Sequence, residues 1–263
     1  MERYRLMVRF FRHWWRAQGR HGLHSPFVYA LYERVIRADR QEDAFRAIEQ
    51  LRGTLLQSRE ELEVTDLGAG SQHAATRTRQ RSIRDLTRLV ARSPRSGRLL
   101  YRLLVHWQPA SVLELGTSLG LGAAYLAAAV PGARVHSVEG CPNIAARARQ
   151  HHETLGLTNI TVHTGDFQEK LPELLTAWTT LDVVFFDGNH RAAPTLAYFE
   201  QCLEKVGPQT VFIFDDIHWS AGMEQAWEKV IRHPKVTVSI DLFHLGLVFF
   251  REHQAKQHFR LRF

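Results

Sequence analysis

From Val112 onward, short runs of β-branched and aromatic residues alternate with helix-length segments, and this alternation constrains the fold more than any other feature of the chain. The runs are "SVLELG", "RVHSVEG", "ITVHTGD", "LDVVFFDG" and "TVFIFDD". Strands separated by helices form a parallel sheet that is covered on both faces. The last two runs, "KVTVSIDLF" and "LGLVFFR", are too close together for a helical crossover. We expect them to pair as an antiparallel hairpin at one edge.

The sequence therefore predicts an α/β fold with a Rossmann-like, doubly wound, mostly parallel seven-stranded sheet and an antiparallel last strand. Before this sheet, helices are expected at roughly 2–18, 26–38, 41–58 and 82–107, the last broken near Pro94. We expect two domains: an arginine-rich helical N-terminal region over 1–92 and the sheet-containing domain over 93–263.

The composition limits the class of protein and the cellular compartment that we expect. Of the 263 residues, 44% are hydrophobic, which is enough for a sizeable core. Cys141 and Cys202 are the only cysteines and cannot build a disulfide framework. Arginines interrupt the N-terminal segment, so it has no apolar leader, and the apolar runs are strand-length. We expect a cytoplasmic protein.

The charge is divided unevenly along the chain. Residues 1–110 contain 21 Arg, no Lys and 11 acidic residues, a net charge of +10, whereas residues 111–263 carry −3. A basic N-terminal region of this kind is typical of a segment that meets something anionic.

Two glycine turns compete for the role of a cofactor loop: "TDLGAGSQ" (Thr65 to Gln72) and "LELGTSLGLG" (Leu113 to Gly122). Such a loop needs a buried strand before it, a helix after it and an acid at the end of the next strand. The second turn meets all three conditions, since Glu139 ends the next strand. The first is followed by "QHAATRTRQRS", which has no apolar stripe. We interpret residues 65–82 as a loop-like interruption and leave open a contribution to a substrate mouth.

The favoured turn has the spacing E-x-G-x-x-x-G, from Glu114 through Gly116 to Gly120. An acid at its base would repel phosphates and suits a cationic ligand. The turn resembles the first motif of class I S-adenosylmethionine-dependent methyltransferases, and later motifs follow in that family's order. The resemblance implies that S-adenosylmethionine is the cofactor. It assigns cofactor binding to Glu114, Gly116, Thr117, Ser118, Gly120, Glu139, Gly140, Asp166, Phe167 and Asp187.

Three carboxylates follow the fourth and fifth strands of the expected sheet. Asp187 ends one strand and the pair Asp215 and Asp216 ends the next, so all three should meet at one edge. Carboxylates gathered in this way need protons or a cation, and their hard oxygens suit Mg²⁺ or another divalent cation. The alternative is an acidic loop that binds arginines of the N-terminal region.

This acidic pattern resembles the metal-dependent O-methyltransferases related to catechol O-methyltransferase. Asp216 departs from the catechol pattern, which has Asn there. An acid at that position is similar to bacterial sugar and natural-product O-methyltransferases with a "DGxH" motif, here Asp187 to His190. The resemblance implies catalytic roles for Asp187 and for His190, which would accept the proton of the acceptor hydroxyl. His218 is the second candidate for the base, and Trp219 is expected in the core or a pocket wall.

The first helix combines arginines with aromatic residues. Arg5, Arg9, Arg12, Arg16 and Arg20 recur at helical spacing, while Tyr4, Met7, Phe11, Trp14 and Trp15 lie on a separate side. Residues 2–18 could meet an anionic membrane surface or RNA. The other interpretation is that the apolar side packs on the protein's own domain or on a second subunit in a homodimer.

The segment "HGLHSPF" and the "DLGAGS" stretch resemble the front end of an uncharacterised group of bacterial class I methyltransferases, which implies no substrate. Helices before the first strand commonly cover the cofactor in the superfamily that the chain resembles, which makes His21 and His24 candidates for positions near the pocket. The leading hypothesis is methyl transfer to a hydroxyl oxygen of a small-molecule acceptor with help from a metal. The alternatives are an RNA (tRNA or rRNA) methyltransferase that uses the basic region, and a non-catalytic binding protein of the same fold.

Overall fold

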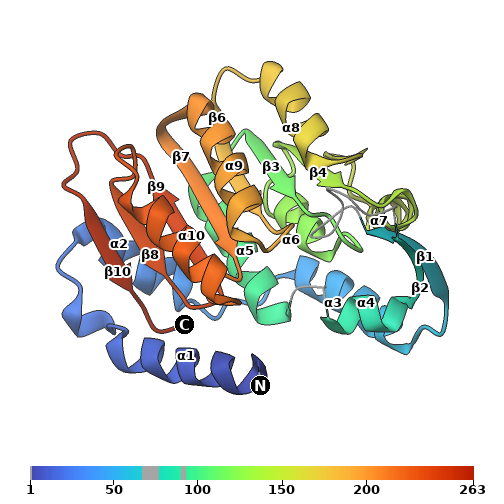
Figure 1. Cartoon of the computed structure of the whole chain (residues 1–263), viewed down its shortest axis with the longest axis horizontal. Coiled ribbons are helices and arrows are strands. Elements are labelled where there is room, and N and C mark those ends of the chain that lie inside the picture. Colours follow the sequence, from blue (N-terminus) through green and yellow to red (C-terminus); the bar gives the residue numbers. More distant parts are fainter. Residues whose placement is uncertain (1, 67–76, 90–92) are drawn as a thin grey trace. The chain divides into compact units, whose positions relative to one another are not determined.

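A computed structural model describes residues 2–66, 77–89 and 93–263 of the chain (Figure 1). The chain divides into two compact units, one of Met1–Ala38 with Leu175–Phe263 and the other of Asp39–Leu174. The expected domain boundary between residues 92 and 93 stays a prediction. Within the described part, no helix is both long and apolar enough to cross a membrane.

The Asp39–Leu174 unit contains three parallel strands in the order β3-β4-β5. These are β3 (Ser111–Leu115), β4 (Arg134–Glu139) and β5 (Ile160–Thr164). Its helices are α3 (Asp43–Gln57), α4 (Ile83–Leu89), α5 (Pro94–Trp107), α6 (Leu121–Ala129), α7 (Pro142–Thr154) and α8 (Phe167–Thr176), the last of which begins in this unit. Every residue of β3 is buried, because helices cover both faces of a parallel sheet.

The expectation of a loop throughout residues 65–82 is wrong. An antiparallel hairpin forms there from β1 (Glu61–Asp66) and β2 (Arg77–Ser82). This hairpin was not predicted because β2, "RTRQRS", lacks the alternation of apolar and polar residues that indicates a strand with one buried face. Residues 67–76, which include Gly68 and Gly70, lie outside the described part of the chain.

The other unit contains five strands in the order β10-β8-β9-β7-β6. These are β6 (Leu181–Phe186), β7 (Val206–Asp215), β8 (Val238–Asp241), β9 (Leu245–Phe249) and β10 (Gln257–Arg260). As expected, β8 and β9 pair antiparallel, and β9 also runs antiparallel to β7. All seven expected strands are confirmed, and β10 is an additional strand parallel to β8.

Helices lie on both faces of these five strands. The helices α9 (Ala192–Cys202) and α10 (Ala221–Arg232) place Phe199 and Trp227 against Phe214 of β7, at 6.0 Å between ring centroids in each case. On the other face, Phe27 of α2 (Pro26–Leu31) contacts Phe249 of β9 at 5.1 Å. The expected mostly parallel, Rossmann-like fold is therefore confirmed.

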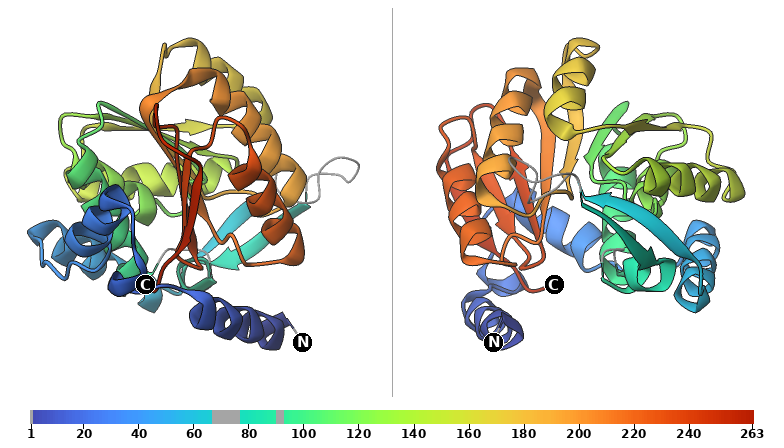
Figure 2. Two further views of the ribbon diagram at one scale, coloured as in Figure 1. Left: turned by 90° about the vertical axis from the view of Figure 1, so that its left-hand side faces the viewer. Right: turned by 45° about the vertical axis from the view of Figure 1, so that its right-hand side comes forward.

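The N-terminal helix α1 (Glu2–Arg16) belongs to this same unit and lies beside the C-terminal end of the chain in all views (Figures 1 and 2). The amide of Gln18 donates to the carbonyl of Arg260 at 2.7 Å, which fixes the exit of the helix to the end of β10. The expected helix at 26–38 forms as α2 followed by a π-helical turn, Tyr32–Ile36.

In the Asp39–Leu174 unit, α5 and α6 approach each other at a glycine. A Cβ on Gly97 would lie 2.3 Å from the ring of Tyr125. That ring cannot easily move, because Tyr125 is buried and its hydroxyl donates to Glu49 at 3.2 Å. Gly53 of α3 is the matched contrast, since no atom lies within 4 Å of the position that its Cβ would take.

We expect Gly97→Ala to destabilise the protein although alanine is the better helix former. Alanine gains about 1 kcal/mol of helix propensity, but overpacking against Tyr125 costs about 1–3 kcal/mol. Gly53→Ala should be neutral or stabilising. Urea unfolding of both variants measures the difference, and equal stabilisation by the two substitutions would contradict the close approach.

Candidate functional site

The turn after β3 has a left-handed backbone at both of its predicted glycines. Gly116 has φ 112° and Gly120 has φ 81°, values that favour glycine. A Cβ on Gly120 would also lie 2.5 Å from Nε2 of His152, so a larger residue does not fit. The amides of Gly116 and Thr117 donate to the carbonyl of Val138 at 3.0 and 3.1 Å, which ties the turn to the end of β4.

Glu114 lies fully buried beneath this turn. The hydroxyl of Ser137 on β4 donates to the Glu114 carboxylate, and the hydroxyl of Thr117 lies 2.5 Å from that of Ser137. Glu114 thus helps to hold the turn through Ser137. Ser137 was not predicted, although a serine inside the apolar run "RVHSVEG" was a usable signal; in the sheet register it lies opposite Glu114.

Two histidines of α7 that were not predicted hold the other end of the turn. His151 Nδ1 donates to the carbonyl of Leu119 at 2.8 Å, and His152 Nε2 donates to that of Gly120 at 2.9 Å. Burial lowers the pKa of both imidazoles, so each is a neutral donor at physiological pH. The pair stabilises the point at which α6 begins.

Glu139 at the end of β4 connects this turn to α7. Its Oε2 accepts from the amide of Ser118 at 2.8 Å, and its Oε1 accepts from that of Cys141 at 2.9 Å. Burial raises the pKa of Glu139, while these amide hydrogen bonds act in the opposite direction. The carboxylate therefore sits where the first turn and the start of α7 meet.

A cavity of about 580 Å³ opens beside Gly140, at the carboxyl ends of β4 and β5. Asp166 lies in its wall and caps α8, since its Oδ1 accepts from the amide of Gln168 at 2.7 Å. Thr65, the first residue of the rejected glycine turn, also lies in the wall. Among the residues that the structure describes, the lining consists of Thr65, Gly140, Pro142, Thr164, Gly165, Asp166, Gln168 and Glu169. The β1–β2 hairpin therefore contributes to this cavity through Thr65.

In the unit that contains β6 and β7, three predicted site residues come together. Asp187 follows β6, Asp215 ends β7, and the potential ligand atoms of these residues and of His190 all lie within 4.8 Å of one another. Asp216 is not a member of this group. It has φ 50°, and its carboxylate lies 3.9 Å from Nδ1 of His244.

The donor set of this group fits a divalent cation. Asn189, which precedes His190, has a buried amide oxygen with no hydrogen-bond partner among the residues that the structure describes. Two carboxylates, an imidazole and an amide oxygen are all ligands that such cations accept in proteins. Asp187 and Asp215 could therefore hold the ion, with the imidazole of His190 beside them.

The other candidates take different positions. Both ring nitrogens of His218 face carboxylates at 2.9 Å, Nδ1 towards Glu224 and Nε2 towards Asp241, so His218 has no free nitrogen to serve as a base. Trp219 is 57% exposed and does not lie in the core. His21 and His24 are exposed, and a role for them near the pocket stays a prediction.

Comparison with known proteins finds a methyltransferase domain model that matches residues 113–217. A catechol O-methyltransferase of Niastella koreensis is 30% identical over 49% of this chain and 58% of that protein. The catechol O-methyltransferase of Bos taurus is 34% identical over 47% of each chain. The chain thus spans about half the length of these relatives.

Among solved structures, an SAH-bound methyltransferase of Podospora anserina superimposes with a TM-score of 0.61. The match covers 88% of this chain and all of that one at 13% identity, which supports the fold. Residues 113–217 therefore match a methyltransferase domain, and the chain is similar over about half its length to catechol O-methyltransferases.

Proposed function

We propose that this protein transfers a methyl group from S-adenosylmethionine to a hydroxyl oxygen of a small molecule, assisted by a divalent cation. The observation that supports this proposal is that the turn after β3 is hydrogen-bonded to Glu139, while Gly140 beside Glu139 lines the cavity. A carboxylate at the end of the second strand is suited to bind ribose hydroxyls. Asp166 would then face the adenine.

The proposal of oxygen as the acceptor rests on the Asp187, His190 and Asp215 group and on the similarity to catechol O-methyltransferases. A bound divalent cation would lower the pKa of a coordinated hydroxyl. Asp187 and Asp215 would hold that cation, and His190 would accept the hydroxyl proton as the oxygen attacks the methyl group. Methylation of RNA and a purely binding role gain no support from the relatives that were found.

The acceptor class can be tested with isotopically labelled S-adenosylmethionine and three probe classes: catechols, glycosides with free hydroxyls, and bulk tRNA. Label should enter a hydroxylated small molecule, and the transfer should stop when a chelator removes divalent ions. Labelling of tRNA alone would contradict the proposal.

Glu139→Gln should weaken the binding of S-adenosylhomocysteine. Loss of a charged hydrogen-bond acceptor is worth about 1.5–3 kcal/mol, or at least about tenfold in affinity. Glu153→Gln, on the exposed side of α7, is the matched control and should bind normally. Isothermal titration calorimetry measures both constants, and an unchanged affinity in Glu139→Gln would remove Glu139 from the cofactor site.

His190→Ala should slow methyl transfer by about 10²–10⁴-fold, which is the usual contribution of a positioned proton acceptor. Affinity for S-adenosylhomocysteine should be unchanged, because His190 is proposed to act on the acceptor. His106→Ala, at an exposed histidine near the end of α5, is the control. Single-turnover rates test this assignment, and a near-normal rate in His190→Ala would show that the chain supplies no base there.

Asp187→Asn should weaken Mn²⁺ binding at least about tenfold, as the loss of a charged ligand does. Electron paramagnetic resonance of free Mn²⁺ measures this in the absence of any acceptor. Asp216→Asn distinguishes the two possible ligand sets: the observed grouping predicts little change, whereas equal weakening by both variants would restore Asp216 as a ligand. Glu228→Gln, on the exposed side of α10, controls for loss of surface charge.

A further inference from the structure

The helix α1 faces its own unit with its polar side. His13 is buried, and its Nε2 donates to Oδ1 of Asp241 at 2.9 Å. Arg9 Nε lies 3.3 Å from the carboxylate of Glu224 on α10. Phe10 is the main apolar contact of this side, packed edge-on against Phe243 at 5.1 Å.

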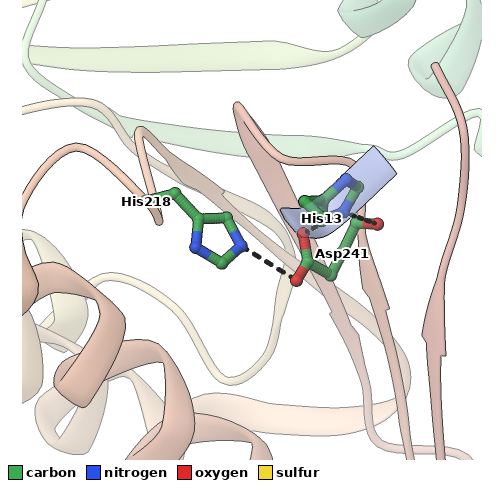
Figure 3. Close-up of side chains that lie close together, drawn as sticks. All are labelled: His13, His218 and Asp241. Atoms are coloured by element: carbon green, nitrogen blue, oxygen red, sulfur yellow. Dashed lines mark hydrogen bonds and ion pairs between the residues drawn. The ribbon is translucent and has the colours of Figure 1, made fainter. Parts of the chain in front are cut away.

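A buried network around Asp241 attaches the polar side of α1 to its unit. The carboxylate of Asp241 lies between the rings of His13 and His218 (Figure 3). Each imidazole is 2.9 Å from a different oxygen of the carboxylate, and Arg260 approaches to 3.6 Å. Burial alone would lower the pKa of His218, but Asp241 and Glu224 together raise it. With both of its oxygens already bonded to histidine and an arginine nearby, Asp241 forms an ion-pair network, and a metal ion is not needed to explain the cluster.

The opposite side of α1 is apolar and exposed. Its six large side chains form what we call the apolar stripe, each exposed over 40% to 84% of its surface. The stripe consists of Tyr4, Met7, Val8, Phe11, Trp14 and Trp15. Their spacing places them on one face of the helix. The expectation that this side packs on the protein's own domain is therefore wrong, because the polar anchor directs it outwards.

Arginines border the apolar stripe on both edges. Arg12 and Arg16 lie exposed along one edge, where Arg12 Nη2 is 3.6 Å from the carboxylate of Glu224. On the other, the guanidinium of Arg262 lies 5.3 Å from the ring of Trp14. No acidic residue occurs between Arg3 and Arg16. The surface that covers this stripe must therefore be apolar in its middle and anionic around it.

We propose that α1 is a membrane-surface helix, which inserts the apolar stripe among the acyl chains and headgroups of a leaflet that contains anionic lipids. A bilayer interface supplies both required features, and tryptophan and arginine are the residues that favour its headgroup level. RNA would pair with the arginines but offers nothing to Met7 and Val8. A second copy of this face would bring its own arginines, and residues 3–16 include no carboxylate to meet them.

The test is sedimentation with phosphatidylcholine vesicles, with and without phosphatidylserine. The wild-type protein should bind the phosphatidylserine vesicles more tightly, and added salt should weaken that binding. In Phe11→Ser combined with Trp15→Ser, affinity should fall about tenfold or more, because burial of two aromatic side chains is lost. Tyr29→Ser, at an exposed tyrosine of α2, is the matched control and should bind as the wild type does.

The arginines are tested separately by Arg12→Gln combined with Arg16→Gln. Each arginine near an anionic surface contributes about 1 kcal/mol, so affinity should fall about tenfold or more. Arg232→Gln, at an exposed arginine of α10, is the control. Calorimetry with S-adenosylhomocysteine should give the same affinity for all these variants, which separates failure of this proposal from failure of the methyltransferase proposal.

Three outcomes would overturn the membrane proposal. One is binding that does not depend on phosphatidylserine, and another is unchanged vesicle binding in the Phe11→Ser, Trp15→Ser variant. The third is evidence that the apolar stripe binds a different partner: light scattering would detect a second copy of the chain, and tRNA binding would detect RNA. If that variant converts a dimer to a monomer, a second copy covers the apolar stripe; if it loses salt-sensitive tRNA binding, the partner is RNA.

Discussion

The candidate cofactor site depends on how the turn after β3 is hydrogen-bonded. The carbonyl of Val138 accepts two of its amides, and the histidine pair of α7 binds two of its carbonyls. The turn needs positive φ angles, so glycine must occupy its ends, and it cannot hold that shape without partners on both sides. Because β4 and α7 supply these partners, the carboxylate of Glu139 is brought to the same place.

A buried carboxylate has a comparable effect in the other unit. Asp241 is fully buried, and the hydrogen bonds of His13 and His218 outweigh the effect of its burial and hold its pKa well below the usual range. The unit therefore retains an anion at neutral pH to which α1 attaches by its polar side. The exposed aromatic side chains of α1 follow from that attachment, since a helix anchored through His13 and Arg9 turns Phe11 and Trp15 away from the core.

The structural features that could be predicted from the sequence are those that one residue type in a local pattern determines. Buried strands appear as apolar runs, and the glycines and Glu139 follow from strand ends and turn geometry. Features that depend on a partner distant in the sequence were not predicted. The roles of Ser137, His151 and His152 depend on groups that only the folded chain brings near them. The orientation of α1 depended on Asp241, more than two hundred residues away, and the all-polar strand β2 found its partner in β1 without an apolar pattern to mark it.

The most direct measurement of the central claim is a crystal structure of the protein with S-adenosylhomocysteine. The account predicts the ribose hydroxyls at the carboxylate of Glu139, the adenine in the cavity beside Gly140 and Asp166, and the amino acid portion against the turn from Gly116 to Gly120. Density for the ligand at any other place, with this cavity empty, would contradict the account.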